Sequence, residues 1–185
     1  MADAYQYTFG GLDVLDRLAR QAPQVFEAEV SSFLSWATEL LQGEVVDRTP
    51  TAAGALRKNI IGRVEVSASG MLGVVGTTVD YAPAIEFGTK PHPVSEEGIL
   101  AIAEWALRKL PLGQAVSIKT GRALKTPGIE DAALAAAHAI AWKIRTKGSQ
   151  GAFMFRDAFA ANRARVTARW EAMVARAVQH LGGSA

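Results

Sequence analysis

The chain has 185 residues, of which 49% are hydrophobic and 21% charged, a composition typical of one globular core. It contains no cysteine, which excludes disulfides, thiol catalysis and thiolate metal sites. No run of about 18 apolar residues occurs, and residues 1–11 lack the pattern of a secretory signal. We therefore expect a protein made in a cytoplasm, with no membrane segment. His92, His138 and His180 are scattered without metal-ligand spacing, so we expect no metal and no cofactor.

The formal net charge of +2 conceals two halves of opposite sign. Residues 1–107 carry a formal charge of −7, and residues 108–185 carry +9. This division suits head-to-tail packing of identical subunits, or a molecule with one face turned toward phosphate. Two solvated faces explain it equally well.

Helical periodicity dominates the first part of the chain. Residues 12–20 form a short helical stretch, and apolar residues recur at helical spacing from Val25 to Val46, which predicts a long amphipathic helix. Pro23 suits its first turn, and the helix should end before Thr49-Pro50.

A change to β-branched residues between Leu56 and Phe87 predicts a β-hairpin that turns near Ser69-Gly70. The segment Tyr81–Glu86 follows it. Pro83 within this segment removes a ladder donor, which indicates an edge strand or a short turn.

The remainder of the chain again has helical signals. Ser95 can cap a helix over residues 99–110, an alanine-rich helix should run from Thr126-Pro127 to Lys147, and a last helix should cover residues 154–181. We expect an exposed loop over 112–127. The prediction is an α+β fold, with one domain over residues 1–185. A short antiparallel sheet packs against long N- and C-terminal helices, and residues 95–147 form an extra helical insertion.

Three short motifs occur in a characteristic order. They are TPTAAGALRKN at residues 49–59, YAPAIEFGTKPH at 81–92 and GAFMFRDAF at 151–159. Their order resembles the small tail-component or neck (tail completion) protein family of tailed bacteriophages, over about residues 25–90 and 151–180. The matching positions are Pro50, Gly54, Leu56, Tyr81, Ala82, Glu86, Phe87, Gly88, Thr89, Phe153, Phe155, Arg156, Ala158 and Phe159. The helical stretch from about Ser95 to Lys147 is longer than the family's usual link, and Ala152 stands where a proline is common.

The resemblance implies a structural virion protein at the head-tail junction or the top of the tail. Such a protein acts in tail completion and head-tail joining, in a ring of six or twelve copies by analogy. Its partners would be copies of itself and other phage neck and tail proteins. It would be located in the virion, and in the host cytoplasm during assembly.

The segment Tyr81–Thr89 has two interpretations. In the simpler one it is a fold-defining turn in which Phe87 is a buried anchor, Gly88 takes a positive φ and the Thr89 hydroxyl bonds nearby backbone. In the other, Glu86 meets a basic partner such as Arg156, within or between subunits. The candidate subunit interface comprises Glu86, Phe87, Lys90, His92, Phe153, Phe155 and Arg156. For His92 alone, an ordinary loop histidine is the favoured interpretation.

Six basic residues form a second candidate set: Lys119, Arg122, Lys125, Arg165, Arg169 and Arg176. They could contact DNA in a central channel without sequence preference, or the acidic half of a neighbouring subunit, and we favour the subunit contact. A basic nucleic-acid-binding module is the alternative function. No nucleophile-base pairing or phosphate-loop pattern is evident, so we predict that the chain is not an enzyme.

Overall fold

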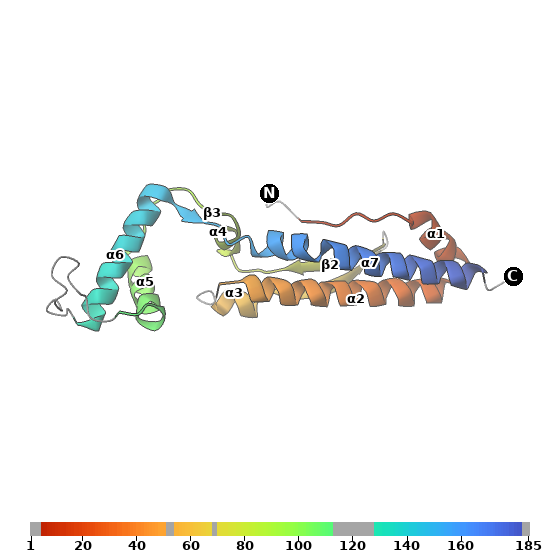
Figure 1. Cartoon of the computed structure of the whole chain (residues 1–185), viewed down its shortest axis with the longest axis horizontal. Coiled ribbons are helices and arrows are strands. Elements are labelled where there is room, and N and C mark those ends of the chain that lie inside the picture. Colours follow the sequence, from red (N-terminus) through yellow and green to blue (C-terminus); the bar gives the residue numbers. More distant parts are fainter. Residues whose placement is uncertain (1–4, 51–53, 68–69, 113–127, 183–185) are drawn as a thin grey trace. The chain divides into compact units, whose positions relative to one another are not determined.

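The computed structural model describes residues 5–50, 54–67, 70–112 and 128–182 (Figure 1). Its contacts divide the chain into two compact units. Unit 1 comprises residues 1–86 and 152–185, and unit 2 comprises residues 87–151. Within the described ranges, no helix is both long and apolar enough to cross a membrane.

Two long helices form the frame of unit 1. Helix α2 (Pro23–Arg48) and helix α7 (Met154–Gly182) match the predicted helices, and Pro23 lies in the first turn of α2 as expected. One buried cluster holds Phe33 with Trp170, and a second holds Val45 with Ala158. Because the order of residues is reversed between the helices, α2 and α7 are antiparallel.

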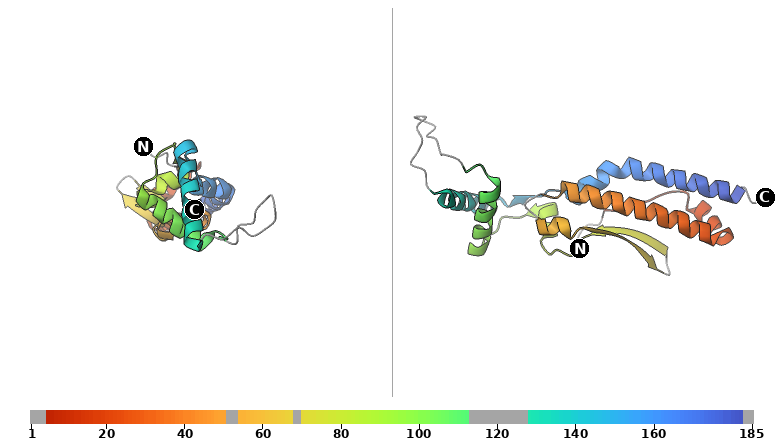
Figure 2. Two further views of the ribbon diagram at one scale, coloured as in Figure 1. Left: turned by 90° about the vertical axis from the view of Figure 1, so that its left-hand side faces the viewer. Right: turned by 90° about the horizontal axis from the view of Figure 1, so that it is seen from below.

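The predicted hairpin consists of β1 (Ile61–Ser67) and β2 (Gly70–Gly76), paired antiparallel, with the short helix α3 (Gly54–Lys58) before it. Both strands contact α2, which also contacts α7, and the right-hand view of Figure 2 shows the hairpin alongside α2. A Cβ built at Gly73 would lie 2.8 Å from Thr38 Cγ2, and one at Gly62 would lie 2.9 Å from the Thr38 carbonyl oxygen. Glycine at these two positions therefore allows the hairpin to approach α2 closely. The α+β prediction, with a short antiparallel sheet and long terminal helices, is confirmed.

The N-terminal segment packs along α7, ahead of helix α1 (Leu12–Gln21). The Tyr7 hydroxyl donates a hydrogen bond of 2.5 Å to the carbonyl oxygen of Phe159. The Phe9 ring stacks on Trp170 at a centroid distance of 4.6 Å, and the Trp170 indole N–H donates to the Gly10 carbonyl at 2.8 Å. This segment and α1 complete the larger apolar cluster of unit 1.

The prediction of an edge strand or a short turn at Tyr81–Glu86 is wrong, because this segment is the helix α4 (Ala82–Phe87). Pro83 lies in its first turn, where the missing N–H costs nothing. Ala82 and Glu86 are buried one turn apart, whereas Phe87 is 42% exposed. Phe87 is therefore not the buried anchor that we predicted.

Unit 2 contains two helices and a short two-stranded ribbon. Helix α5 (Glu96–Lys109) starts at the predicted cap, where the Ser95 hydroxyl accepts from the Gly98 N–H at 3.2 Å. Helix α6 (Ile129–Lys147) packs against α5. Strand β3 (Gly88–Thr89) pairs antiparallel with β4 (Ser149–Gln150). The predicted loop over 112–127 lies outside the described residues, apart from its first position.

Candidate functional site

The buried carboxylate of Glu86 binds the first turn of α7. Its two oxygens accept hydrogen bonds of 3.0 Å from the main-chain N–H groups of Phe155 and Arg156. The first N–H groups of a helix have no partner within the helix, and the positive end of the helix dipole attracts a carboxylate. Glu86 therefore caps a 29-residue helix from a position about 70 residues earlier in the chain.

One of our two interpretations expected Glu86 to pair with the side chain of a basic residue such as Arg156. The guanidinium of Arg156 makes other contacts instead. Its Nε donates to Asp157 at 2.8 Å, and the guanidinium carbon lies 3.7 Å from the centre of the Phe153 ring. The hydrogen bond with Asp157 is the main reason why the pKa of Arg156 is raised above its ordinary value. The Glu86–Arg156 contact is thus real, but it uses the backbone of Arg156.

Main-chain hydrogen bonds reinforce this contact. The carbonyl of Ile85 accepts from the N–H of Ala152 at 2.8 Å, and the carbonyl of Glu86 accepts from the N–H of Phe153 at 3.0 Å. Phe153 has a φ of 50°, a left-handed conformation that is uncommon for an aromatic residue. We call this set of contacts around α4 and the start of α7 the Glu86 clamp. It closes unit 1 at the point where the chain leaves for residues 87–151 and returns.

The other candidate interface residues on the YAPAIEFGTKPH motif are exposed. They are Phe87, Lys90 and His92. His92 Nδ1 lies 2.9 Å from the carbonyl oxygen of Lys90, which holds the ring close to its own loop. Their role in an interface stays a prediction.

The ribbon of β3 and β4 depends on two glycines. Gly88 has a φ of 77°, as predicted, and Gly148 has a φ of 75°. A Cβ at Gly88 would lie 2.2 Å from the Ser149 carbonyl oxygen, and one at Gly148 would lie 2.0 Å from that of Thr89. The Thr89 hydroxyl accepts from the Ser149 N–H at 3.2 Å, which confirms that it bonds nearby backbone.

The described basic candidates lie on α7 and contact α2. Arg165 and Arg169 lie over the Trp36 ring, with guanidinium carbons 5.7 and 4.6 Å from its centre. Arg176 donates to the Glu29 carboxylate at 2.7 Å within the same chain. Lys119, Arg122 and Lys125 lie outside the described residues.

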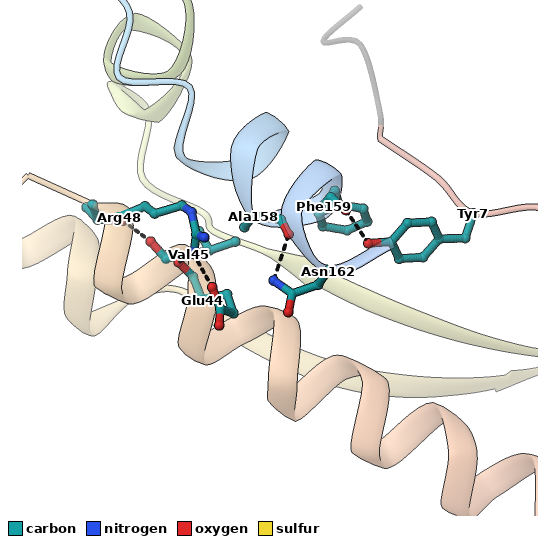
Figure 3. Close-up of polar contacts among 8 residues, drawn as sticks. Tyr7, Glu44, Val45, Arg48, Ala158, Phe159 and Asn162 are labelled. Atoms are coloured by element: carbon teal, nitrogen blue, oxygen red, sulfur yellow. Dashed lines mark hydrogen bonds and ion pairs between the residues drawn. The ribbon is translucent and has the colours of Figure 1, made fainter. Parts of the chain in front are cut away.

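Polar groups also occupy the seam between α2 and α7 (Figure 3). Asn162 is buried there, and its amide donates to the Ala158 carbonyl at 2.9 Å. Glu44 on α2 forms an ion pair with Arg48, and the hydrogen bond from Arg48 is the largest cause that lowers the pKa of Glu44. A smaller contribution comes from Asn162. Each of these two bonds stays within its own helix, and the described residues form no cluster able to hold a metal ion.

Sequence reasoning missed three features of this site: the β3–β4 ribbon, the stacking on Trp36 and the packing of residues 5–11 on α7. Two-residue strands are too short for any periodicity. The aromatic residues Tyr5, Tyr7 and Phe9 at alternate positions were a usable signal, because alternation is typical of an extended, half-buried segment.

In this region, charged and aromatic side chains connect α7 to α2. Residues 13–88 match the family described as "HK97-gp10_like: Bacteriophage HK97-gp10, putative tail-component". The match confirms the resemblance to tailed-phage tail proteins over this part of the chain. No curated protein and no solved structure shows significant similarity to the chain.

The matched segment runs from α1 to the start of β3 and includes the whole YAPAIEF sequence of α4. A phage tail component is a structural part of the virion and not an enzyme, in agreement with the predicted class. The second part of the resemblance, over residues 151–180, lies outside the matched segment and stays a prediction.

Proposed function

We propose that this chain is a structural subunit that forms a ring at the head-tail junction or the top of the tail. In this role it completes the tail and joins it to the head, with other neck and tail proteins as neighbours. The family match over residues 13–88 carries the proposal. That segment supplies α1, α2, the hairpin and the Glu86 side of the clamp.

Unit 1 suits a ring subunit because its two long helices pack on each other in two buried clusters, and α7 is held in addition by other parts of the unit. The Glu86 clamp holds the start of α7, and the Phe9–Trp170 stack holds its C-terminal half. A rigid subunit keeps a constant angle between neighbours, and a constant angle is what closes a ring. Six or twelve copies are proposed by family analogy. We also propose that the chain is one domain, in which residues 95–147 are a helical insertion.

Electron microscopy of the purified full-length chain tests the proposal. We expect closed rings of uniform symmetry that persist in high salt, because the acidic and basic halves are only part of the contact. A chain that stays monomeric at high concentration and also fails to bind to tails would contradict the ring.

Nucleic-acid binding is the second candidate, favoured by the two arginines that stack on Trp36 and by the excess of basic residues in the C-terminal half. A DNA-retardation assay separates the candidates. Retardation by a monomer, lost steeply as salt rises, would support the nucleic-acid module. Salt-resistant rings without DNA affinity at physiological salt support the assembly protein.

A further inference from the structure

Unit 2 buries few large side chains. Among its described residues, the buried apolar side chains are all alanines: Ala106, Ala133, Ala137 and Ala141. Five large apolar residues on the same two helices are exposed instead, namely Leu100 at 59%, Leu107 at 44%, Ile129 at 62%, Leu134 at 38% and Trp142 at 65%. Alanine burial contributes little stabilisation, and grouped exposed apolar residues mark interaction surfaces.

The exposed residues of α5 form a stripe along one face. Glu97, Leu100, Glu104 and Leu107 follow one another at intervals of three, four and three residues, and all four are exposed. At 3.6 residues per turn these positions fall on one side of the helix. Ala106 is buried on the side toward α6. We call these four residues the α5 stripe.

Helix α6 carries a matching stripe. Asp131, Leu134, His138, Trp142 and Arg145 recur at intervals of three or four residues, and all five are exposed. The buried alanines of α6 lie on another face, toward α5. The α5 and α6 stripes therefore both point away from the contact between the two helices.

The two stripes are complementary when the helices run antiparallel. If Leu100 faces Trp142 of another copy, the same register places Glu97 opposite Arg145 and Glu104 opposite His138. Leu107 then lies one residue out of register with Leu134. Within the α5 stripe, each leucine then lies at or beside an apolar residue, Glu97 faces an arginine and Glu104 faces a histidine.

We infer that α5 of one copy packs antiparallel on α6 of the next copy, so that unit 2 forms a head-to-tail contact between subunits. This inference rests on the proposed function, because it assigns part of the ring contact to unit 2. A head-to-tail contact repeats around a closing ring and covers both stripes on every copy. A two-fold contact of α6 with itself would leave the α5 stripe uncovered and place two copies of His138 against each other.

Cysteine crosslinking of the full-length chain tests the contact, since the natural sequence has no cysteine. The variants Glu97→Cys and Arg145→Cys are purified with tags of different mass, mixed and treated with a short thiol crosslinker. We expect the mixed dimer and little of either homodimer. Adding Trp142→Glu to the second variant should lower the yield at least about tenfold, as expected for a central tryptophan.

The matched control is Lys143→Glu, an exposed change beside Trp142 but off the α6 stripe, which should leave the yield unchanged. Homodimers of Arg145→Cys, or crosslinking of His138→Cys to itself, would overturn the inference in favour of a two-fold contact. Rings without the mixed dimer would overturn this inference and leave the proposed function intact. The mixed dimer in open chains would support the contact and contradict the ring, and absence of both would overturn both.

Discussion

The carboxylate of Glu86 accepts a hydrogen bond of 3.0 Å from the main-chain N–H of Arg156, 70 residues later in the chain. With the bond from Phe155, it satisfies two N–H groups at the start of α7 that the helix itself cannot satisfy. Because this carboxylate is buried and used within one chain, its first role is in folding.

Replacing Glu86 should therefore destabilise the subunit. We expect Glu86→Ala to lower the free energy of unfolding by about 2–4 kcal/mol, because two charge-assisted bonds to a helix terminus are lost. Glu86→Gln keeps an acceptor and should cost about half as much. Urea denaturation followed by circular dichroism measures both, with exposed Glu39→Ala on α2 as the control. Normal stability combined with loss of ring assembly would favour an interface role for Glu86.

The approach of the hairpin to α2 should depend on the pair Gly73 and Thr38. Gly73→Ala places a methyl group 2.8 Å from Thr38 Cγ2, and overpacking of this kind costs about 1–3 kcal/mol. Thr38→Ser removes that methyl group and keeps the hydroxyl, which donates to the Leu34 carbonyl. The double variant should recover at least about 1 kcal/mol relative to the sum of the single changes. Strict additivity would show that the hairpin shifts to accommodate the change.

The ribbon between β3 and β4 should not tolerate a side chain at Gly88. Gly88→Ala combines a positive φ with a Cβ 2.2 Å from a carbonyl oxygen, so it should break the pairing with Ser149 and Gln150. Faster hydrogen exchange at the Ser149 amide reports the loss. Gly43→Ala is the matched control, because a Cβ there meets nothing within 4 Å. It should stabilise α2 by about 0.5–1 kcal/mol. Unchanged exchange in Gly88→Ala would contradict this description of the ribbon.

Tyr7 should make stability depend on alkaline pH. Burial raises the pKa of Tyr7 above its ordinary value of 10.0, so the folded state holds the phenolic proton more tightly than the unfolded state does. The stabilisation is fully present below pH 10 and is lost as the pH rises from there through the raised pKa. Tyr7→Phe should lower the free energy of unfolding by about 1 kcal/mol at neutral pH, because the hydrogen bond to Phe159 is lost. Above pH 10 the free energy of unfolding of this variant should fall less steeply than that of the unchanged protein. Equal alkaline slopes for both proteins would contradict this.

Arg169 and Trp36 should be energetically coupled. The guanidinium of Arg169 lies over the indole at 4.6 Å, and partly exposed contacts of this kind contribute about 0.5–1 kcal/mol. A double-mutant cycle with Arg169→Ala and Trp36→Leu measures the coupling. In the assembly interpretation, Arg169→Ala leaves DNA retardation at its background level. A marked fall in retardation would instead assign Arg169 to phosphate contact.

The long helices and the hairpin were predictable because their apolar residues repeat at regular spacing, from Val25 to Val46 in α2 for example. Helix α4 was not. Its six residues give too little periodicity, and Pro83 is compatible with both an edge strand and a helix start.

The pairing of Glu86 with α7 was only half predictable. The sequence indicated that Glu86 has a partner near Arg156. It shows which side chains are basic but not which main-chain N–H groups lie close by, and the partner is a main-chain N–H. Similarly, the basic residues of α7 suggested an external ligand, whereas Arg176 pairs with Glu29 of the same chain. Which charges are satisfied internally depends on how α2 and α7 pack, and spacing along one helix does not give that.

The most direct test of the proposed function is cryo-electron microscopy of the head-tail region in the phage particle that encodes this chain. We expect a closed ring of copies at the top of the tail, with neighbouring copies joined through α5 and α6. Particles that carry the chain elsewhere, or that assemble joined heads and tails without it, would contradict the account.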